Sequence, residues 1–276
     1  KSKQKFCLQC ALIELFSYMQ KTKLPYISPV MFVFEELYST HNFIEQQDAS
    51  EYLLRLFQHL DVSVIKKIFE FNIRRTMTCK LCEKTSLAIE SHNILPLPLN
   101  KTLGNLTNLF DKFYQIEHFT EENAYRCQHC QKIQAGKIQL SFETLPTVLI
   151  ILLKRFRADG KNKLNYSIQY NEILDLKKYC SIPQDISSYQ LYGIICHVGT
   201  SSNVGHYIAY YKDQLNDTWF KANDHQITKY DIKDILNKRR NNEYMLFYVS
   251  SLNKLNISKK KHIAGKGKKQ LIFFYS

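Results

Sequence analysis

Two pairs of cysteines constrain the fold of this chain more than any other feature. Cys79 and Cys82 form one Cys-x-x-Cys motif, and Cys127 and Cys130 form a second. Thiolates on two tight turns supply four soft ligands, which suit tetrahedral zinc. The interval between the motifs is wider than in a compact zinc finger, so we expect two separate hairpins to meet at one structural zinc site. Redox motifs or disulfides are the alternative, and they suit an intracellular chain less well.

The positive charge of the chain is concentrated at its C-terminal end. Of a formal net charge of +13 over 276 residues, seven lysines and no acidic residue lie between Lys254 and the end. We expect residues 253–276 to form a basic tail, acting as a solvated disordered end, a nuclear address or a nonspecific contact for polyanions. This distribution counts against a basic zinc protein that binds RNA or DNA, so nucleic acid is not the expected partner.

No part of the chain has the pattern of a membrane or secretion segment. No apolar run reaches the length of a membrane span, and no signal-peptide core follows the basic start. We therefore expect an intracellular protein, in the cytoplasm or the nucleus, with no membrane partner. Residue 1 is Lys rather than Met, which indicates a piece of a longer chain or a processed one.

Helical patterns dominate the first quarter of the chain, and strand patterns follow. Apolar spacing predicts an amphipathic helix over residues 6–20, and Ser28 as a cap followed by Pro29 predicts a second helix over residues 28–37. Short alternating segments begin at about residue 67. The continuous apolar run at 144–153 predicts a central strand that is buried on both faces.

Asp48 begins a third predicted helix. Glu51, three residues later, completes a capping box with it, and an apolar face follows. The cap explains Asp48 but not Gln46 and Gln47 in front of it. Their amides both donate and accept hydrogen bonds, so they suit recognition of an extended backbone.

A hairpin near the C-terminus contains the best candidate for a catalytic base. Residues 204–211 and 218–224 read as two strands separated by a short polar turn. Centring the hairpin on that turn sets His206 opposite Asn223 or Asp224. An amide or carboxylate there would hold the imidazole in one tautomer, as in catalytic histidines. A structural histidine with satisfied hydrogen bonds explains the same pattern, and the hairpin alone does not separate the two.

The motifs resemble, in type and in order, those of the ubiquitin-specific proteases. These papain-like cysteine enzymes hydrolyse the bond after the C-terminal glycine of ubiquitin. The matching segments are Gln46 to Leu53, the two Cys-x-x-Cys motifs, Leu145 to Phe156, Gly205 to Tyr207 with Trp219 to Asp224, and Tyr244 to Tyr248. The resemblance implies an α+β catalytic domain over residues 1–252 that is incomplete at its N-terminus. Its parts would be thumb helices over about 1–66, zinc-bearing β fingers over about 67–143 and a β-sheet palm over about 144–252.

The resemblance also implies roles for individual residues. His206 takes the position of the general base and Asn223 that of the group that orients it, with Asp224 beside it as a substitute. The expected partners are ubiquitin and ubiquitinated proteins, with ubiquitin held between fingers and palm. The residues expected to contact the C-terminal tail of ubiquitin are Gln46, Gln47, Asp48, Gly205 and Tyr207. Gly205 in particular would let a narrow tail pass close to the backbone.

The nucleophile of the family has no match in this sequence. Cys7 and Cys10 are the only cysteines near the start, and both fall inside a predicted helix rather than at a helix N-terminus, where a reactive thiolate is favoured. We therefore expect the catalytic cysteine upstream of Lys1, so that the chain alone is inactive. The alternative is a noncatalytic ubiquitin-binding scaffold of the same fold.

Overall fold

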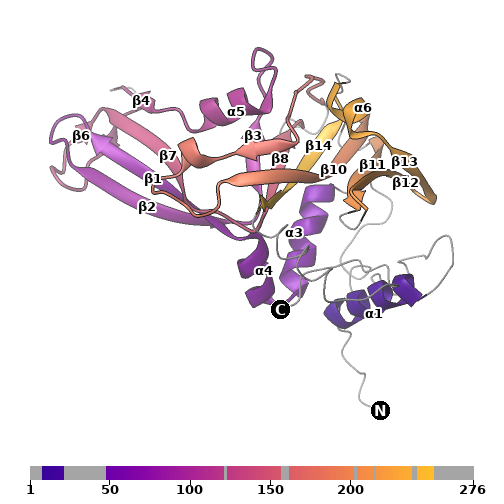
Figure 1. Ribbon diagram of the computed structural model, residues 1–276. Coiled ribbons are helices and arrows are strands. Elements are labelled where there is room, and N and C mark those ends of the chain that lie inside the picture. Colours follow the sequence, from indigo (N-terminus) through magenta and orange to yellow (C-terminus); the bar gives the residue numbers. More distant parts are fainter. Residues whose placement is uncertain are drawn as a thin grey trace.

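The chain builds an α+β molecule from two main sheets and a few helices (Figure 1). The computed structural model describes residues 8–21, 48–120, 123–156, 162–201, 204–213, 216–237 and 241–251. Its helices are α1 (Leu8–Lys21), α3 (Ala49–His59), α4 (Val62–Phe69), α5 (Leu106–Phe113), α6 (Ile232–Asn237) and the 3-10 helix η2 (Lys177–Tyr179).

An eight-stranded sheet, which we call the palm sheet, forms the body of the molecule. Its order is β13-β12-β11-β10-β14-β8-β3, with β9 paired to β10. The strands are β3 (Leu95–Pro98), β8 (Val148–Lys154), β9 (Ile173–Asp175), β10 (Ser188–Ser201), β11 (Val204–Asp213), β12 (Thr218–Asn223), β13 (Gln226–Tyr230) and β14 (Glu243–Ser250). The mixed α+β fold expected from the sequence is confirmed.

Strand β8 lies at the centre of the core, with both faces buried. Leu149 and Ile151 belong to a cluster that includes residues of α5. Val148 and Ile150 point the other way, into a cluster with residues of α3 and α4. Helix α5 and the α3–α4 pair accordingly cover opposite faces of the sheet (Figure 1). The predicted central strand is thus confirmed, because helices on both sides require apolar side chains on both faces.

A four-stranded sheet projects from the palm sheet, and we call it the finger sheet (Figure 1). Its order is β2-β1-β7-β4. The strands are β1 (Phe71–Cys79), β2 (Thr85–His92), β4 (Glu117–Phe119) and β7 (Gly136–Thr144), and a separate two-stranded ribbon pairs β5 (Tyr125–Arg126) with β6 (Ile133–Gln134). The far end of β1 brings the first Cys-x-x-Cys motif to the tip of this sheet.

The expected start of the strands at residue 67 is wrong by a few residues. Helix α4 continues to Phe69, and the first strand begins at Phe71. The side chain of Asp61 caps α4 by accepting from the N–H of Ser63 at 2.7 Å. The ring of Phe69 stacks on Phe57 of α3 with centroids 4.7 Å apart. Phe69, which the alternation assigned to the strand, therefore belongs to the end of α4, and the strand itself starts at Phe71.

Several expectations concern residues outside the described part of the chain. These are the helix over residues 28–37, Gln46 and Gln47, and the basic tail. The helix predicted over 6–20 is confirmed as α1 (Leu8–Lys21), in which Ala11 and Leu15 are buried. The boundaries of thumb, fingers and palm stay predictions.

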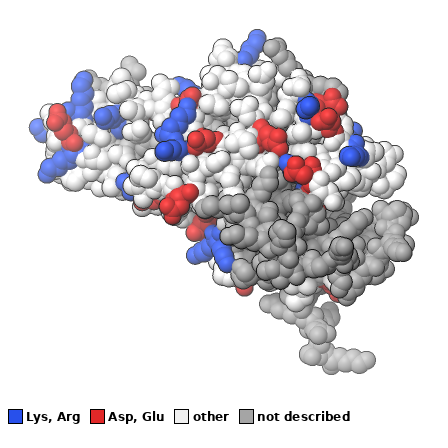
Figure 2. Space-filling view, in the orientation of Figure 1, with Lys and Arg blue, Asp and Glu red and all other residues white. Residues whose placement is uncertain are grey.

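Hydropathy and charge of the described residues have two plain features. No helix among them has the length and apolar character needed to cross a membrane. On the face shown in Figure 2, lysines and arginines are interspersed with aspartates and glutamates. Among the described residues on that face, the basic side chains form no continuous stripe.

Candidate active site and metal centre

His206 lies near the start of β11, where its strand pairs with β10 and approaches β12. The β11–β12 register pairs Ala209 with Ala222. Continued by one step, this register sets Asn223 opposite Ile208, two residues from His206 on the same face of the strand. The two side chains therefore meet diagonally across the ladder, rather than from directly opposite positions as the sequence pattern suggested.

The imidazole of His206 contacts the amide of Asn223. Nε2 lies 2.6 Å from Oδ1 of Asn223 and 3.8 Å from Oδ2 of Asp224. Because an amide oxygen only accepts, Nε2 carries the proton in this contact, and Nδ1 keeps a lone pair that can accept another. The side chain of His206 is 45% exposed and that of Asp224 is 73% exposed. The ring is thus accessible to a second reactant and is held mainly by Asn223.

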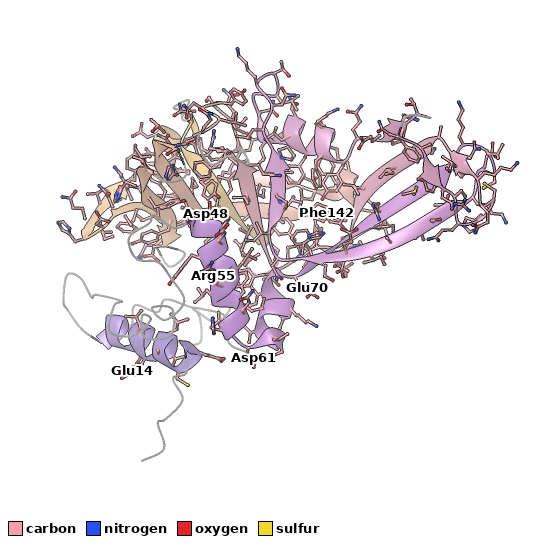
Figure 3. The ribbon with its side chains drawn as sticks, turned by 180° about the vertical axis from the view of Figure 1, so that it is seen from behind. Glu14, Asp48, Arg55, Asp61, Glu70 and Phe142 are labelled. Atoms are coloured by element: carbon pink, nitrogen blue, oxygen red, sulfur yellow. The ribbon has the colours of Figure 1, made fainter. Side chains whose placement is uncertain are left out.

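Asp48 joins the start of α3 to the palm sheet (Figure 3). One carboxylate oxygen, Oδ1, accepts from the N–H and the hydroxyl of Ser50 at 2.8 and 2.5 Å. The hydroxyl of Tyr244 on β14 donates to the other oxygen, Oδ2. Nearby, the hydroxyl of Tyr207 accepts from the N–H of the first residue of α3 at 3.4 Å. The predicted cap at Asp48 is confirmed, and its second partner is a tyrosine that the sequence pattern did not single out.

The two tyrosines beside Asp48 stay neutral near pH 7. Burial raises the pKa of Tyr207 to about 12. Burial also raises the pKa of Tyr244, and the hydrogen bond to Asp48 adds to the effect. Tyr207 follows His206 in β11, so the start of α3 is fixed beside the strand that presents the imidazole. One indication in the sequence that Tyr244 belongs to the site is its place in the segment that resembles the closing strand of the family.

Gly205 is packed against a buried histidine. A Cβ atom added to Gly205 would lie 2.2 Å from Nε2 of His197 and 2.9 Å from the carbonyl oxygen of Val198. The ring of His197 is fully buried and makes edge contacts with Phe156 and Tyr207. Packing inside the protein therefore accounts for the absence of a side chain at Gly205. The sequence pattern gave His197 no role.

Four cysteine sulfurs meet at the tip of the finger sheet. The Sγ atoms of Cys79, Cys82, Cys127 and Cys130 all lie within 4.8 Å of one another. Sγ of Cys79 is 3.9 Å from that of Cys130, and Sγ of Cys82 is 3.7 Å from that of Cys127. These separations are too long for disulfides, but tetrahedral Zn–S bonds of about 2.3 Å require S···S distances of about 3.8 Å. The cluster can hold a metal ion, and its donor set fits zinc.

The two cysteine turns have the same local geometry. The residue after each motif, Glu83 in one and Gln131 in the other, adopts a left-handed φ of 57° and 58°. Its N–H donates to the carbonyl of the first cysteine at 3.0 Å and 2.9 Å, respectively. In the second turn, backbone N–H groups of Cys130 and His129 lower the pKa of Cys127 to about 6. Two matched turns thus direct four thiols to one point.

None of the other described cysteines contacts His206. Cys10 is exposed on α1, Cys196 is buried on β10, and Cys180 is half-buried after η2. Cys7 lies outside the described residues. Within the described part of the chain, the imidazole therefore has an orienting amide but no thiol beside it.

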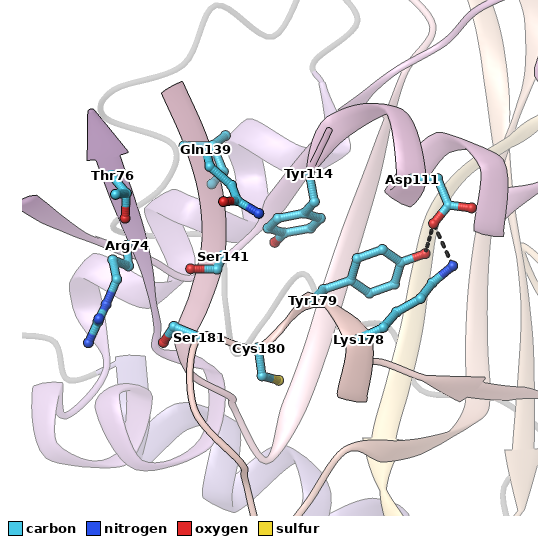
Figure 4. Close-up of a pocket in the computed structure, with 11 residues that line it drawn as sticks. Arg74, Thr76, Asp111, Tyr114, Gln139, Ser141, Lys178, Tyr179, Cys180 and Ser181 are labelled. Carbon is cyan, nitrogen blue, oxygen red and sulfur yellow. Dashed lines mark hydrogen bonds and ion pairs between the residues drawn. The ribbon is translucent and has the colours of Figure 1, made fainter. Parts of the chain in front are cut away.

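A polar cavity of about 460 Å³ lies between the finger sheet, α5 and η2 (Figure 4). Its two cationic side chains are each paired with a carboxylate. Arg74 donates to Glu143 at 2.5 and 2.8 Å, and Lys178 lies 2.5 Å from Asp111. The hydroxyl of Tyr179 also donates to Asp111, at 2.7 Å. None of the residues predicted for the site lines this cavity, and its charges already balance one another.

Comparison with known proteins places the chain in a family. The sequence matches the family described as ubiquitin carboxyl-terminal hydrolase over residues 1–248. The chain belongs to this family of cysteine proteases. The resemblance to ubiquitin-specific proteases is thereby confirmed.

Similar proteins come from animals and plants. The mouse ubiquitin carboxyl-terminal hydrolase 17-like protein C is 32% identical over 232 residues, which cover 78% of this chain and 42% of the mouse protein. Ubiquitin carboxyl-terminal hydrolase 16 of Arabidopsis thaliana is 34% identical over 205 residues, which cover 73% of this chain and 20% of the plant protein. The chain thus spans less than half the length of either relative.

A solved structure shares the fold. It is the SAGA DUB module of Ubp8, Sgf11, Sus1 and Sgf73 bound to monoubiquitin. The matched chain is 26% identical with a TM-score of 0.75, and the match covers 91% of this chain and 60% of that chain. The fold inferred from the sequence is therefore that of this family.

Proposed function

We propose that this chain is part of a thiol-dependent deubiquitinase that hydrolyses the bond after the C-terminal glycine of ubiquitin. The observation that carries the proposal is the 2.6 Å contact between Nε2 of His206 and Oδ1 of Asn223 in a chain of this family. An imidazole held by an amide on one nitrogen is oriented to take a proton on the other. His206 is the general base and Asn223 the orienting group, while Asp224 at 3.8 Å is a weaker second partner.

The reaction needs a thiol that the described residues do not bring to His206. We assign it to a cysteine of the parent protein other than Cys7, Cys10, Cys180 and Cys196. Nδ1 of His206 takes the thiol proton, and the sulfur attacks the carbonyl carbon of the terminal glycine. As the C–N bond breaks, the imidazolium gives its proton to the leaving amine. Water then hydrolyses the thioester, with His206 again accepting the proton, and ubiquitin leaves with a free carboxylate.

Ubiquitin is the proposed substrate, with its tail directed toward His206. Support comes from the matched fold, whose solved representative is bound to monoubiquitin. We propose that the tail passes Gln46, Gln47, Asp48, Gly205 and Tyr207. Both carboxylate oxygens of Asp48 already accept hydrogen bonds from the protein, so Asp48 helps to bind the tail by holding the N-terminal end of α3 in place. The protein substrates would be ubiquitinated proteins.

We also propose that zinc binds Cys79, Cys82, Cys127 and Cys130 and has a structural role. Four thiolates leave no ligand position for water, so the metal would tie the two finger hairpins together rather than take part in catalysis.

The test is hydrolysis of ubiquitin that carries a fluorogenic amide at its C-terminus, with the full-length parent protein. His206→Gln should lower kcat by about 100-fold or more, as loss of a general base does. His59→Gln, at an exposed histidine in the last turn of α3, is the matched control and should leave the rate unchanged. Tight ubiquitin binding with no turnover in the unmutated protein would refute the enzyme and favour the scaffold alternative.

A further inference from the structure

Strand β10 loses one neighbour next to His206. The ladder between β10 and β14 ends where Cys196 pairs with Glu243. Strand β10 continues beyond that pair, and there Val198 is the partner of His206 across the β10–β11 ladder. The segment of β10 that supports His206 therefore has a strand on one side only.

Backbone groups on the open side of β10 still need hydrogen-bond partners. The N–H of His197 donates to the carbonyl of Asn242 at 2.8 Å, so His197 faces the side where β14 has ended. Residues two apart in a strand direct their backbone groups to the same side, which places the carbonyl of Gly199 there as well. His197 is fully buried, and a buried carbonyl without a partner costs about 1–3 kcal/mol.

Lys163 fills the position of the missing strand. Its side chain is buried, with the residue only 7% exposed. The ammonium group donates to the carbonyl of His197, to Oδ1 of Asn242 at 3.1 Å and to the carbonyl of Gly199 at 3.4 Å. Three acceptors match the three N–H groups of a lysine. The carbonyls of His197 and Gly199 lie on β10 close to its turn into β11, and Asn242 immediately precedes β14.

Arg155 holds the backbone that carries Lys163. The N–H of Leu164 donates to the carbonyl of Arg155 at 2.7 Å, and Nη1 of Arg155 donates to the carbonyls of Leu164 and Tyr166 at 2.9 and 2.8 Å. Nε of Arg155 donates to the carbonyl of Glu243 at the start of β14. The segment after β8 is therefore anchored at the same point where β14 begins.

The charged and titratable groups around Lys163 are Arg155, Glu243, Cys196 and His197. Burial, and after it the positive charge of Arg155, lowers the pKa of Lys163 to about 8. Glu243 lies against Arg155 at 3.7 Å and offsets part of this charge. Near pH 7 the lysine remains protonated, so its bonds to the carbonyls are charge-assisted.

We propose that Lys163 is a positioning residue for His206. Its ammonium group clamps the β10 segment opposite His206, and it thereby keeps the imidazole in register with Asn223. The assignment rests on the proposed function only in the part that concerns catalysis. Lys163 does not touch the reacting atoms, and its contribution passes through the backbone of His197 and Gly199.

Hydrogen exchange of the 276-residue chain tests the clamp without requiring activity. Lys163→Met removes the donors at similar side-chain length. We expect amide exchange over residues 204–208 to rise about tenfold or more, while β1 and β7 in the finger sheet keep their protection. Lys212→Met is the matched control, because the side chain of this lysine is only 7% exposed and lies on β11, the strand of His206, but at its far end, where it binds Glu172 and Asp217. It should leave residues 204–208 unchanged.

Kinetics of the full-length protein supply a second readout. We expect Lys163→Met to lower kcat about tenfold or more with KM almost unchanged, since only the orientation of His206 is disturbed. Unchanged exchange over 204–208, or a rise that is equal in the finger sheet, would overturn the clamp. A full-length protein that lacks hydrolase activity but shows the local rise would refute the proposed function and leave the clamp standing.

Discussion

The contact between Gly205 and His197 makes a quantitative prediction about Gly205→Ala. No left-handed φ is involved at this glycine, so the effect of the new methyl group is steric. Its carbon would lie 2.2 Å from Nε2 and 2.4 Å from Cε1 of His197, where ordinary contacts begin at 3.4 Å. The two groups must separate by about 1 Å, and any movement of the ring disturbs its contacts with Phe156 and Tyr207. Overpacking of this kind costs about 1–3 kcal/mol.

Chemical denaturation of four variants measures this cost. Gly193→Ala is the matched control, because its methyl group would lie 3.5 Å from the nearest atom of Phe247 on the same sheet, an ordinary contact. We expect Gly205→Ala to lower the free energy of unfolding by about 1–3 kcal/mol and Gly193→Ala to change it little. In a His197→Ala background, Gly205→Ala should lower the free energy of unfolding much less. The double-mutant cycle should then give a coupling energy between the two positions of about 1–3 kcal/mol. Equal costs of Gly205→Ala in both backgrounds would refute the steric reasoning.

Three further predictions concern the metal, acid stability and the orienting group. Cys127→Ser should abolish stoichiometric zinc binding, measured by elemental analysis, whereas Cys180→Ser should retain the metal, because only the first belongs to the four-sulfur cluster. Hydrogen bonds from Arg74 and then Ser181 lower the pKa of Glu143 below its ordinary value of 4.5. The ionised carboxylate of Glu143 therefore stabilises the fold above pH 4.5, and this stabilisation is lost as the pH falls through the folded-state pKa. In urea unfolding, the unmutated protein should have a larger free energy of unfolding than Glu143→Gln near neutral pH, and the difference should disappear in acid. Asn223→Ala should lower kcat/KM for ubiquitin amide hydrolysis by about tenfold or more, and Asp224→Ala should change it far less, because Nε2 of His206 lies 2.6 Å from the first and 3.8 Å from the second. Equal losses would contradict the assignment of Asn223.

Features that depend on local sequence were predictable. The paired Cys-x-x-Cys motifs indicated a four-sulfur cluster, because a short turn brings each pair together and shared metal chemistry brings the pairs to one place. Asp48 was recognisable as a helix cap three residues before Glu51. The apolar run at β8 indicated burial on both faces. In each case the responsible interactions lie within a few residues or follow from one pattern.

Helix α4 was missed although a local signal was present. Asp61 followed by Ser63 is a capping pair, and Ile65 with Phe69 has helical spacing. The alternation of apolar and polar residues over 69–73 indicates a strand more clearly than a helix. The C-terminal end of α4 was therefore interpreted as the beginning of that strand. The competing pattern was correct only from Phe71 onward.

The support of the candidate site could not be found from sequence, because it depends on distant segments. Lys163 meets His197 across a separation of 34 residues, and Tyr244 meets Asp48 across 196. Neither lysine nor tyrosine is unusual at such positions, and no spacing rule connects them. The diagonal contact of His206 with Asn223 likewise depends on a register that differs by one from the symmetric hairpin.

Covalent trapping tests the central claim most directly. Ubiquitin with a thiol-reactive electrophile at its C-terminus is incubated with the full-length protein, and the modified cysteine is identified by peptide mapping. We predict one adduct on a cysteine other than Cys7, Cys10, Cys180 and Cys196, and we predict its loss in His206→Gln. An adduct on one of those four cysteines, or an adduct that His206→Gln leaves intact, would contradict the account.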